Sequence, residues 1–283
     1  QFGPILHVLR YSAADFDRDI APILVKLGFD AKKAAAIAAK IKVDPARGAG
    51  HALGAEMRSD SSHLRTRVGK GGMDYKGYNI AIHELGHNVE QTITLQDVPH
   101  YMMHGVPNTA FTEAWAFVFQ KRDLELLGIP STSPQKAHLM ALDNFWSSYE
   151  IMGVSLVDMR VWKWLYKHPH ATKSELKAAV ISIAKNVWNS YFAPVFGTTD
   201  EPILAVYSHM IDYPLYLPAY PVGHLAEFQI EQHIEGKNLG REMERICRQG
   251  RLTPDIWMKG AVGRALAVEP TLKATTEALR KIP

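Results

Sequence analysis

The chain carries His83-Glu84-Leu85-Gly86-His87 directly after an apolar stretch, residues 75–82. On an α-helix, residues i and i+4 lie one above the other on the same face, so the imidazoles of His83 and His87 can hold one metal ion. Glu84, one position further round the helix, is poorly placed as a ligand but can reach a water on that ion. The pattern therefore predicts a buried helix with two metal ligands and a neighbouring general base.

A catalytic metal site also needs a third protein ligand and an open position for water. Residues 108–120, Asn-Thr-Ala-Phe-Thr-Glu-Ala-Trp-Ala-Phe-Val-Phe-Gln, form an apolar helical pattern with a single acidic residue, Glu113. A carboxylate is costly to bury in such a helix unless it is paired or bound to a metal. Solvated histidines on a surface helix, or a glutamate at a helix edge, would each explain only one of the two observations. Together they favour one Zn²⁺ ion held by His83, His87 and Glu113, as in HExxH zinc peptidases.

The composition, 47% hydrophobic and 22% charged over 283 residues, is ordinary for a soluble globular protein. A net charge of +3 is too small to predict a nucleic-acid or membrane-surface partner. No apolar run is long enough to span a bilayer.

Cys247 is the only cysteine, which excludes an internal disulfide and mildly favours the cytoplasm. The chain begins at Gln1 rather than Met, and we expect it to be a fragment of a longer polypeptide.

The periodicity of the chain is mostly helical, so we expect a mainly α fold with a small β-sheet edge beside the HExxH helix. Within one catalytic region we expect N-terminal helices in residues 1–60, a strand plus the zinc-site helices in 61–130, and a helical part in 131–283. Outside the metal site, helical spacing and capping signals predict helices at 15–26, 31–41, 133–152, 157–167, 174–191, one ending near 234, and two opening near 254 and 270.

One short segment, residues 62–68, alternates apolar and polar side chains, which predicts a strand with one polar face. In zinc peptidases an edge strand pairs with the extended substrate backbone and lays the scissile carbonyl over the metal. We expect this strand to have that role, and Arg65 or Arg67 could hold a substrate carboxylate with two hydrogen bonds. A solvated sheet edge protected by its charges is the alternative interpretation.

Attack of water on a peptide carbonyl produces an oxyanion, which a neutral hydrogen-bond donor can stabilise. The stretch that begins at Tyr207 concentrates Tyr213, Tyr216 and Tyr220 around His209. A single tyrosine is more often a core residue with a satisfied hydroxyl. This cluster is interrupted by prolines and ends in a glycine, so we expect it to form an irregular wall of the site. Tyr216, Tyr213, Tyr220 and His209 are therefore candidate catalytic residues.

These motifs resemble the helical gluzincin peptidases, in particular the carboxypeptidase Taq family and the thimet oligopeptidase/oligopeptidase F family. HELGH followed by Gln91, with the Glu113 helix at this interval, is similar to both families in outline. Leu64-Arg-Thr-Arg67 is similar to the Thr-Thr-Arg that precedes the metal helix of the Taq family. Tyr216-Leu-Pro-Ala-Tyr-Pro-Val-Gly-His-Leu-Ala-Glu-Phe-Gln229 is similar to that family's Tyr-Phe-Pro-x-Tyr-x-x-Gly-x-Leu-x-x-x-Gln. The similarity extends from about residue 60 to 235.

The resemblance implies a zincin-like helical metallopeptidase of the gluzincin type, with the catalytic tyrosine at Tyr216 or a neighbour and His209 as a second donor. It also implies a further N-terminal helical lobe that roofs the cleft, this chain being the catalytic C-terminal half. The sequence departs from the Taq family in three places. Asp-x-Arg-x-Thr is replaced by Ser-Ser-His-Leu-Arg at 61–65, His-Glu-Ser-Gln by Thr-Glu-Ala-Trp at 112–115, and Ile-Arg-x-x-Ala-Asp is absent. The choice between carboxypeptidase and endopeptidase is therefore open.

The predicted function is zinc-dependent hydrolysis of short or unfolded peptides by attack of a zinc-bound water. One alternative is an inactive zinc-binding module that captures peptides or a partner protein in a helical cleft. Glu84 argues against it, because this residue contributes nothing to coordination. The other alternative is a zinc hydrolase of a non-peptide amide, since a metal, a base and an oxyanion donor do not identify the acyl group.

Overall fold

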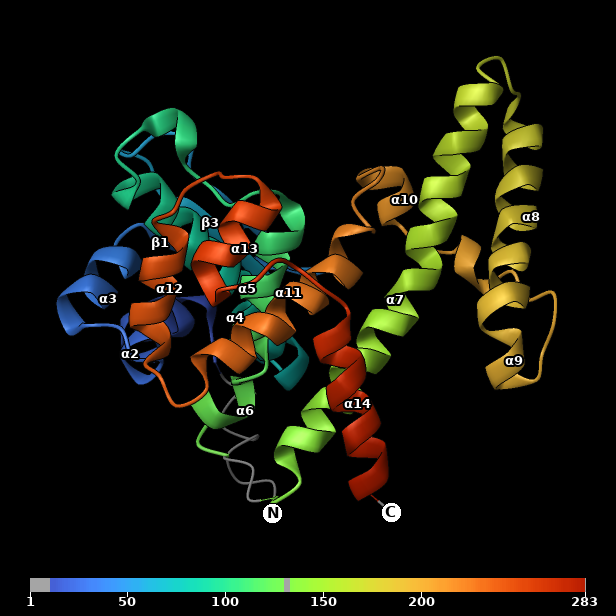
Figure 1. Cartoon of the computed structure of the whole chain (residues 1–283). Coiled ribbons are helices and arrows are strands. Elements are labelled where there is room, and N and C mark those ends of the chain that lie inside the picture. The colour runs from blue at the N-terminus through green and yellow to red at the C-terminus, as the bar shows by residue number, and fades with distance from the viewer. Residues whose placement is uncertain (1–10, 130–132, 283) are drawn as a thin grey trace.

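The computed structural model describes residues 11–129 and 133–282. The fold is mainly α-helical with one small sheet, as predicted (Figure 1). In chain order the elements are α2 (Ala13–Lys26), α3 (Ala31–Ala38), β1 (Ile41–Ala46), β2 (His51–Leu53), β3 (Ser62–Arg67), α4 (Tyr75–Asp97), η1 (Tyr101–Met103), α5 (Thr109–Gln120), α6 (Asp123–Leu126), α7 (Lys136–Lys167), α8 (Lys173–Tyr191), α9 (Ala193–Phe196), η2 (Ile203–Ala205), α10 (His209–Asp212), α11 (Ala219–Ile234), α12 (Leu239–Cys247), α13 (Pro254–Val262) and α14 (Glu269–Lys281).

The sheet has the strand order β1-β3-β2, with β1 parallel and β2 antiparallel to β3. The prediction that β3 is an edge strand is wrong, because neighbours pair with both of its sides. The predicted helix 31–41 is also too long: α3 ends at Ala38 and Ile41 begins β1. After the helix, Ile41 pairs with Ser62 of β3, and the Lys40 carbonyl accepts a hydrogen bond from the Ser62 amide (2.8 Å). Residues 11–60 therefore contain two strands that we did not predict.

Contacts between β3 and α4 join the sheet to the helix of the HELGH motif. Alternate residues of β3, including Leu64 and Thr66, are buried. The Thr66 hydroxyl donates to the Gly77 carbonyl (2.7 Å) in the first turn of α4. Asp74 caps this helix, since its carboxylate accepts from the Gly77 amide (2.8 Å). The start of α4 is thereby held at the end of β3.

Helix α5 lies between α4 and α11, and glycines bring their backbones close together. A Cβ atom at Gly86 of α4 would lie 2.7 Å from the Cα of Ala116 in α5, closer than real Cβ contacts. A Cβ atom at Gly223 of α11 would lie 3.0 Å from the Ala110 carbonyl oxygen of α5. These glycines set the spacing of the three helices, because a side chain at either position would push its neighbour away.

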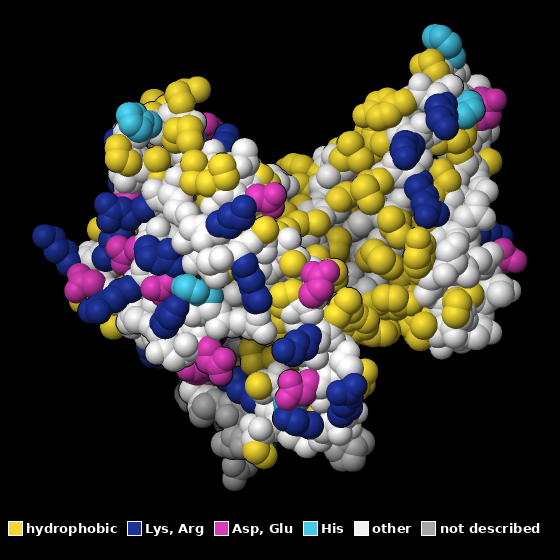
Figure 2. Space-filling model, viewed as in Figure 1, with side chains coloured by type: hydrophobic (Ala, Val, Ile, Leu, Met, Phe, Trp, Pro, Cys, Tyr) yellow, Lys and Arg dark blue, Asp and Glu magenta, His cyan; other side chains and the backbone are white. Residues whose placement is uncertain are grey.

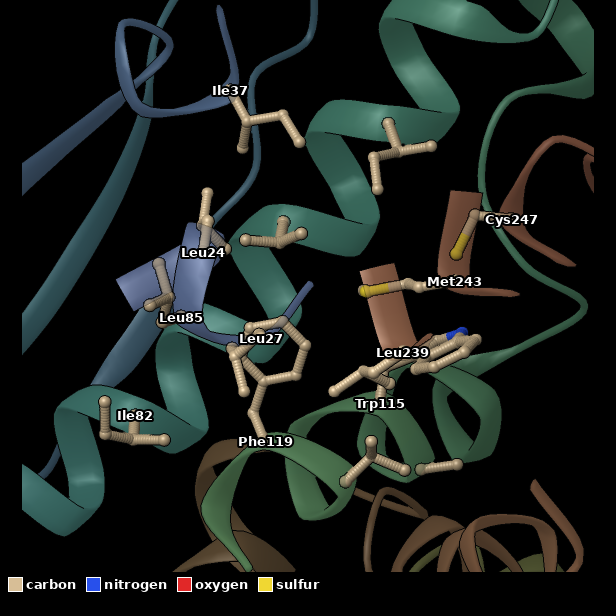
Figure 3. Packing of buried hydrophobic residues seen from close by; sticks show 14 of the residues in the cluster. Leu24, Leu27, Ile37, Ile82, Leu85, Trp115, Phe119, Leu239, Met243 and Cys247 are labelled. Carbon is tan, nitrogen blue, oxygen red and sulfur yellow. The ribbon is translucent and has the colours of Figure 1, made fainter. Parts of the chain in front are cut away.

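One continuous core lies behind this helical layer. Figure 3 shows Leu85 of α4, Trp115 and Phe119 of α5, and Leu239 and Met243 of α12 pointing into a common interior. Met243, Leu85, Trp115 and Phe119 are completely buried. Helix α12 therefore closes the core on the side of α4 and α5.

Helices α7 and α8 form an arm that projects from the body (Figure 1). We predicted separate helices at 133–152 and 157–167, but α7 runs unbroken from Lys136 to Lys167. Gly153 lies within this helix and provides space for the Phe192 ring, which would lie 2.7 Å from a Cβ there. Apolar side chains gather on the arm surface turned toward the body (Figure 2). None of the described helices combines the length and apolarity needed to cross a membrane.

The arm has a small core of its own, called here the arm cluster. Its buried members are Val154, Val157, Ala184, Val187, Phe192, Leu204 and Leu217. The first half of α7 packs elsewhere, where Ala141 contacts Phe228 of α11 and Ala278 of α14. One helix thus connects the body to the arm.

Replacing Gly86 by alanine tests the close contact between α4 and α5. We expect Gly86→Ala to lower the free energy of unfolding by about 1–3 kcal/mol, because the added methyl group collides with backbone rather than with a flexible side chain. Gly48→Ala is the matched control, since a methyl group there would have no other atom within 4 Å. It should change stability by less than about 1 kcal/mol. Chemical denaturation gives both values, and equal effects of the two substitutions would contradict the packing argument.

Candidate active site

Side chains from α4 and α5 converge at one point, as the sequence predicted. His83, His87 and Glu113 each offer a ligand atom, and the three atoms lie within 4.8 Å of one another. Glu113 Oε2 is 3.4 Å from His83 Nε2 and 3.7 Å from His87 Nε2. This oxygen is buried and has no hydrogen-bond partner among the residues that the structure describes. Two imidazole nitrogens around an orphaned carboxylate oxygen fit a divalent metal, which would satisfy all three atoms.

A chain of partly buried hydrogen bonds determines which nitrogen of His83 faces the other two groups. Its Nδ1 lies 2.9 Å from Gln120 Oε1, and Gln120 Nε2 donates to Asn79 Oδ1 (2.7 Å). Asn79 Nδ2 in turn donates to the carboxylate of Asp123 (2.6 Å). A carboxylate can only accept, so each amide in the chain is oriented and His83 Nδ1 must carry a proton. Nε2 is then free to coordinate a metal.

His87 is held in a similar way from α5. Its Nδ1 lies 2.9 Å from the hydroxyl oxygen of Thr112. Glu90, on the same helix as His87, is buried, and burial raises its pKa to about 7. The Thr112 hydroxyl oxygen can accept a hydrogen bond from Nδ1 of His87, which again leaves Nε2 of the imidazole free.

Burial and neighbouring charges decide the protonation states of the cluster. Burial raises the pKa of Glu113, but the neighbouring imidazoles of His87 and His83, together with the hydrogen bond from Tyr216, outweigh burial and lower it to about 2. Burial lowers the pKa of His87 to about 4. Burial also acts to lower the pKa of His83, but its interactions with Glu113 outweigh this and raise it above the usual value. At neutral pH Glu113 is ionised and His87 is neutral, which are their metal-binding forms.

Glu84 occupies the wall of the same cleft and is almost buried. Burial raises the pKa of its carboxyl group to about 7, and the charge of Glu113 acts in the same direction. The nearby His83 acts in the opposite direction, as does the backbone of Ala52 in β2. Gly50 makes this approach of β2 possible, since a Cβ there would lie 2.8 Å from Glu84 Oε1 and 2.2 Å from the Ile80 side chain. The site thus holds a carboxyl group that can accept and release a proton near neutral pH.

The tyrosine cluster faces these groups from the opposite side of the cleft. The Tyr216 hydroxyl donates to Glu113 Oε1 (2.5 Å), and burial together with the charge of Glu113 raises its pKa. The Tyr220 hydroxyl lies 3.2 Å from His209 Nε2. Tyr213 also lines the cleft but is 55% exposed. The structure therefore brings all four predicted residues to the cleft, with Tyr216 in contact with Glu113 of the candidate metal site.

The two predicted arginines differ in position. Arg67 lines the cleft and pairs with Asp74, the N-cap of α4. Arg65 is exposed and does not line the cleft. The described cleft also carries basic residues that sequence reasoning missed, Arg47 and Lys76.

The cleft has a volume of about 660 Å³ and is bounded by the free edge of β2, the helices α4 and α5, and the tyrosine cluster. Sequence reasoning missed the β2 wall and the partners of the histidines. One signal was present: Gln120 lies two helical turns after Glu113, on the same face of α5. No comparable signal marked residues 50–53, because their role depends on pairing with a distant strand.

The architecture is that of helical metallopeptidases. No protein-family model matches this sequence, and no curated protein is similar to it in sequence. Among solved structures, one described as oligoendopeptidase F matches 94% of this chain with a TM-score of 0.66 at 14% identity, and the match covers 48% of that protein. PZ peptidase A matches 94% of the chain with a TM-score of 0.60 at 13% identity over 47% of its own length.

A third structure is the M32 carboxypeptidase from Deinococcus radiodurans R1. It matches 99% of the chain with a TM-score of 0.53 at 14% identity, and 66% of its own length is covered. The predicted helical metallopeptidase fold is confirmed by these similarities. The chain spans about half the length of the first two structures that it matches.

Metal analysis tests the ligand set. We expect the chain to bind one zinc ion, and His83→Ala and Glu113→Ala each to weaken zinc affinity by more than about a hundredfold, since loss of an outer partner alone costs 10- to 100-fold. His63→Ala is the matched control, because this histidine is exposed on β3. Competition with a chelator measures the affinities. Unchanged zinc affinity in the Glu113 variant would remove Glu113 from the ligand set.

Proposed function

We propose that this chain is the catalytic region of a zinc-dependent metallopeptidase that cleaves short or unfolded peptides. The observation that carries the proposal is the convergence of His83, His87 and the unpartnered oxygen of Glu113 beside the carboxyl group of Glu84. The similarity in fold to metallopeptidases supports the same assignment. Zinc is the proposed ion because two imidazoles and one carboxylate are typical of catalytic zinc sites.

In this proposal Glu84 is the general base. A zinc ion held by the three ligands would act as a Lewis acid and lower the pKa of water to about 7. Glu84 takes a proton from the attacking water and later passes it to the leaving amine. A carboxyl group whose pKa is raised to about 7 by burial is suited to both transfers near neutral pH.

Tyr216 is the proposed oxyanion donor. Its raised pKa keeps the phenol protonated, so the hydroxyl can donate to the developing negative charge of the tetrahedral species. It now donates to Glu113, and a short movement would redirect it toward the substrate. His209, in contact with Tyr220, is the proposed second donor at the same wall. Tyr213 and Tyr220 complete this wall.

The peptide is proposed to bind along the free edge of β2 rather than along β3. Residues 50–53 line the cleft next to Glu84, and an extended chain added there would pair by backbone hydrogen bonds. Such pairing needs an unfolded segment, which favours short or flexible peptides. Arg67 is already paired with Asp74, so we do not propose it as a dedicated carboxylate clamp.

A screen of mixed-sequence peptides with the zinc-loaded protein tests the function, with Glu84→Gln as its matched control. We expect cleavage by the unmodified chain and a loss of about 10²–10⁴ in kcat for Glu84→Gln, because the amide cannot accept the proton. Zinc content and fold should be unchanged in the variant.

The outcomes separate the alternative functions. Cleavage by Glu84→Gln at the normal rate would disprove the general-base role. Tight peptide binding without cleavage would favour the inactive capture module. Hydrolysis of other amides without cleavage of any peptide would favour a non-peptide amide hydrolase.

A peptide and its C-terminally amidated twin distinguish the two modes of binding. We expect comparable kcat/KM values, because Arg65 is outside the cleft and Arg67 is paired with Asp74. A loss of about a hundredfold on amidation, roughly 3 kcal/mol, would instead show that a basic residue binds the terminal carboxylate and that the enzyme trims C-termini.

A further inference from the structure

Tyr216 reaches the site from a strained piece of backbone. The residue before it, Leu215, has a φ of 62°, in the left-handed region that residues other than glycine rarely adopt. The residue after Tyr216, Leu217, is completely buried in the arm cluster. The sharp turn at Leu215 lets consecutive side chains point in different directions, Tyr216 toward Glu113 and Leu217 into the arm.

The arm helix α7 holds this turn from behind. The carboxylate of Asp158 accepts a hydrogen bond from the Leu215 amide (2.9 Å). One helical turn earlier, the Ser155 hydroxyl lies 2.9 Å from the Leu217 carbonyl and 2.7 Å from the Ile151 carbonyl of its own helix. Its single hydrogen can therefore serve either acceptor. Helix α7 thus contacts the backbone on both sides of Tyr216, with Asp158 at the Leu215 amide and Ser155 at the Leu217 carbonyl.

Asp158 is only 1% exposed and serves no other described partner than this turn. A buried carboxylate is costly unless it is hydrogen-bonded, and here the Leu215 amide donates to it. A strained backbone conformation persists only where several surrounding interactions hold it in place, and such conformations cluster at functional sites. Asp158 supplies this constraint at Leu215.

We propose that Asp158 is a positioning residue, which fixes the turn at Leu215 and so holds the Tyr216 hydroxyl at the metal cluster. The inference rests on the proposed function of Tyr216 as oxyanion donor. It assigns to the arm a direct part in the reaction, because the residue that aims the donor belongs to α7.

The chain offers a matched arrangement far from the cleft. Asp200 is the other described non-glycine residue with a left-handed φ (59°), and its amide donates to Asn189 Oδ1 of α8 (2.8 Å). Asn189 thus holds a strained turn in the same manner as Asp158, but the turn carries no residue of the site. Asn189→Ala controls for a general loss of arm stability.

The experiment is a double-mutant cycle of Asp158→Ala with Tyr216→Phe, measured by peptide hydrolysis with the zinc-loaded chain. Removing an oxyanion donor costs about 10²–10³ in kcat, and Tyr216→Phe should lie in this range. Asp158→Ala should lower kcat by about 10- to 100-fold with little change in KM, because a misplaced donor is felt in the transition state. In the Tyr216→Phe background it should cost almost nothing further.

Two measurements keep the test independent of activity and of folding. Amide hydrogen exchange of the peptide that contains Leu215 and Leu217 should accelerate in Asp158→Ala and stay unchanged in Asn189→Ala. If Asp158→Ala fails to fold, Asp158→Asn replaces it, since its amide keeps the volume and one acceptor oxygen. The loss in kcat should be smaller for Asp158→Asn than the loss expected for Asp158→Ala.

The possible failures are distinguishable. Full activity of Tyr216→Phe would show that Tyr216 is not the oxyanion donor. The proposed metal site would still be tested separately by His83→Ala and Glu113→Ala. Normal activity of Asp158→Ala beside an impaired Tyr216→Phe would overturn the positioning role. Additive losses in the double variant, or an equal loss in Asn189→Ala, would also overturn it, because they would show an effect on the arm as a whole.

Discussion

The contact of α4 with α5 at Gly86 is the constraint on which the site depends. The two imidazoles come from α4 and the carboxylate from α5, so the distance between the helices decides whether the three groups can share one ion. The backbones approach so closely that a methyl group at Gly86 would collide with Ala116. Gly223 brings α11 against the other side of α5, near Glu113. The spacing of the ligand atoms is therefore set by missing side chains, while the apolar core behind α4 and α5 holds the helices at that distance.

Buried polar groups orient the side chains that this spacing brings together. The path from His83 through Gln120 and Asn79 ends at Asp123, and this direction of donation leaves only one tautomer of the imidazole. The unpartnered Glu113 oxygen is the exception, and an unsatisfied oxygen in a buried site is costly without a ligand. Such a site is preorganised, because its ligands need little rearrangement to bind a metal.

The sequence was sufficient for the parts of the site that depend on local periodicity. His83, His87 and Glu84 share one helix, and Glu113 was recognisable as the single charge in an apolar helix. It was insufficient where distant segments decide the structure. Strand β2 has three residues and exists only through pairing with β3, so no local pattern predicted it or the burial of β3 between two neighbours. A contact with a distant segment is also found at Gly153. We predicted a helix break near this residue, but Gly153 lies within α7 and provides space for the Phe192 ring.

The unbroken course of α7 has a mechanical consequence. A helix of 32 residues is about 48 Å long, and it packs on α11 and α14 near one end and on α8 further along. Because no loop interrupts α7, a tilt of the arm must either rotate the whole helix or bend it. A small rotation of α7 would then also displace the tyrosine wall of the cleft, because Asp158 of this helix binds the Leu215 amide next to Tyr216. A molecule bound at the tip of the arm could in this way change the geometry of the candidate site without contacting it.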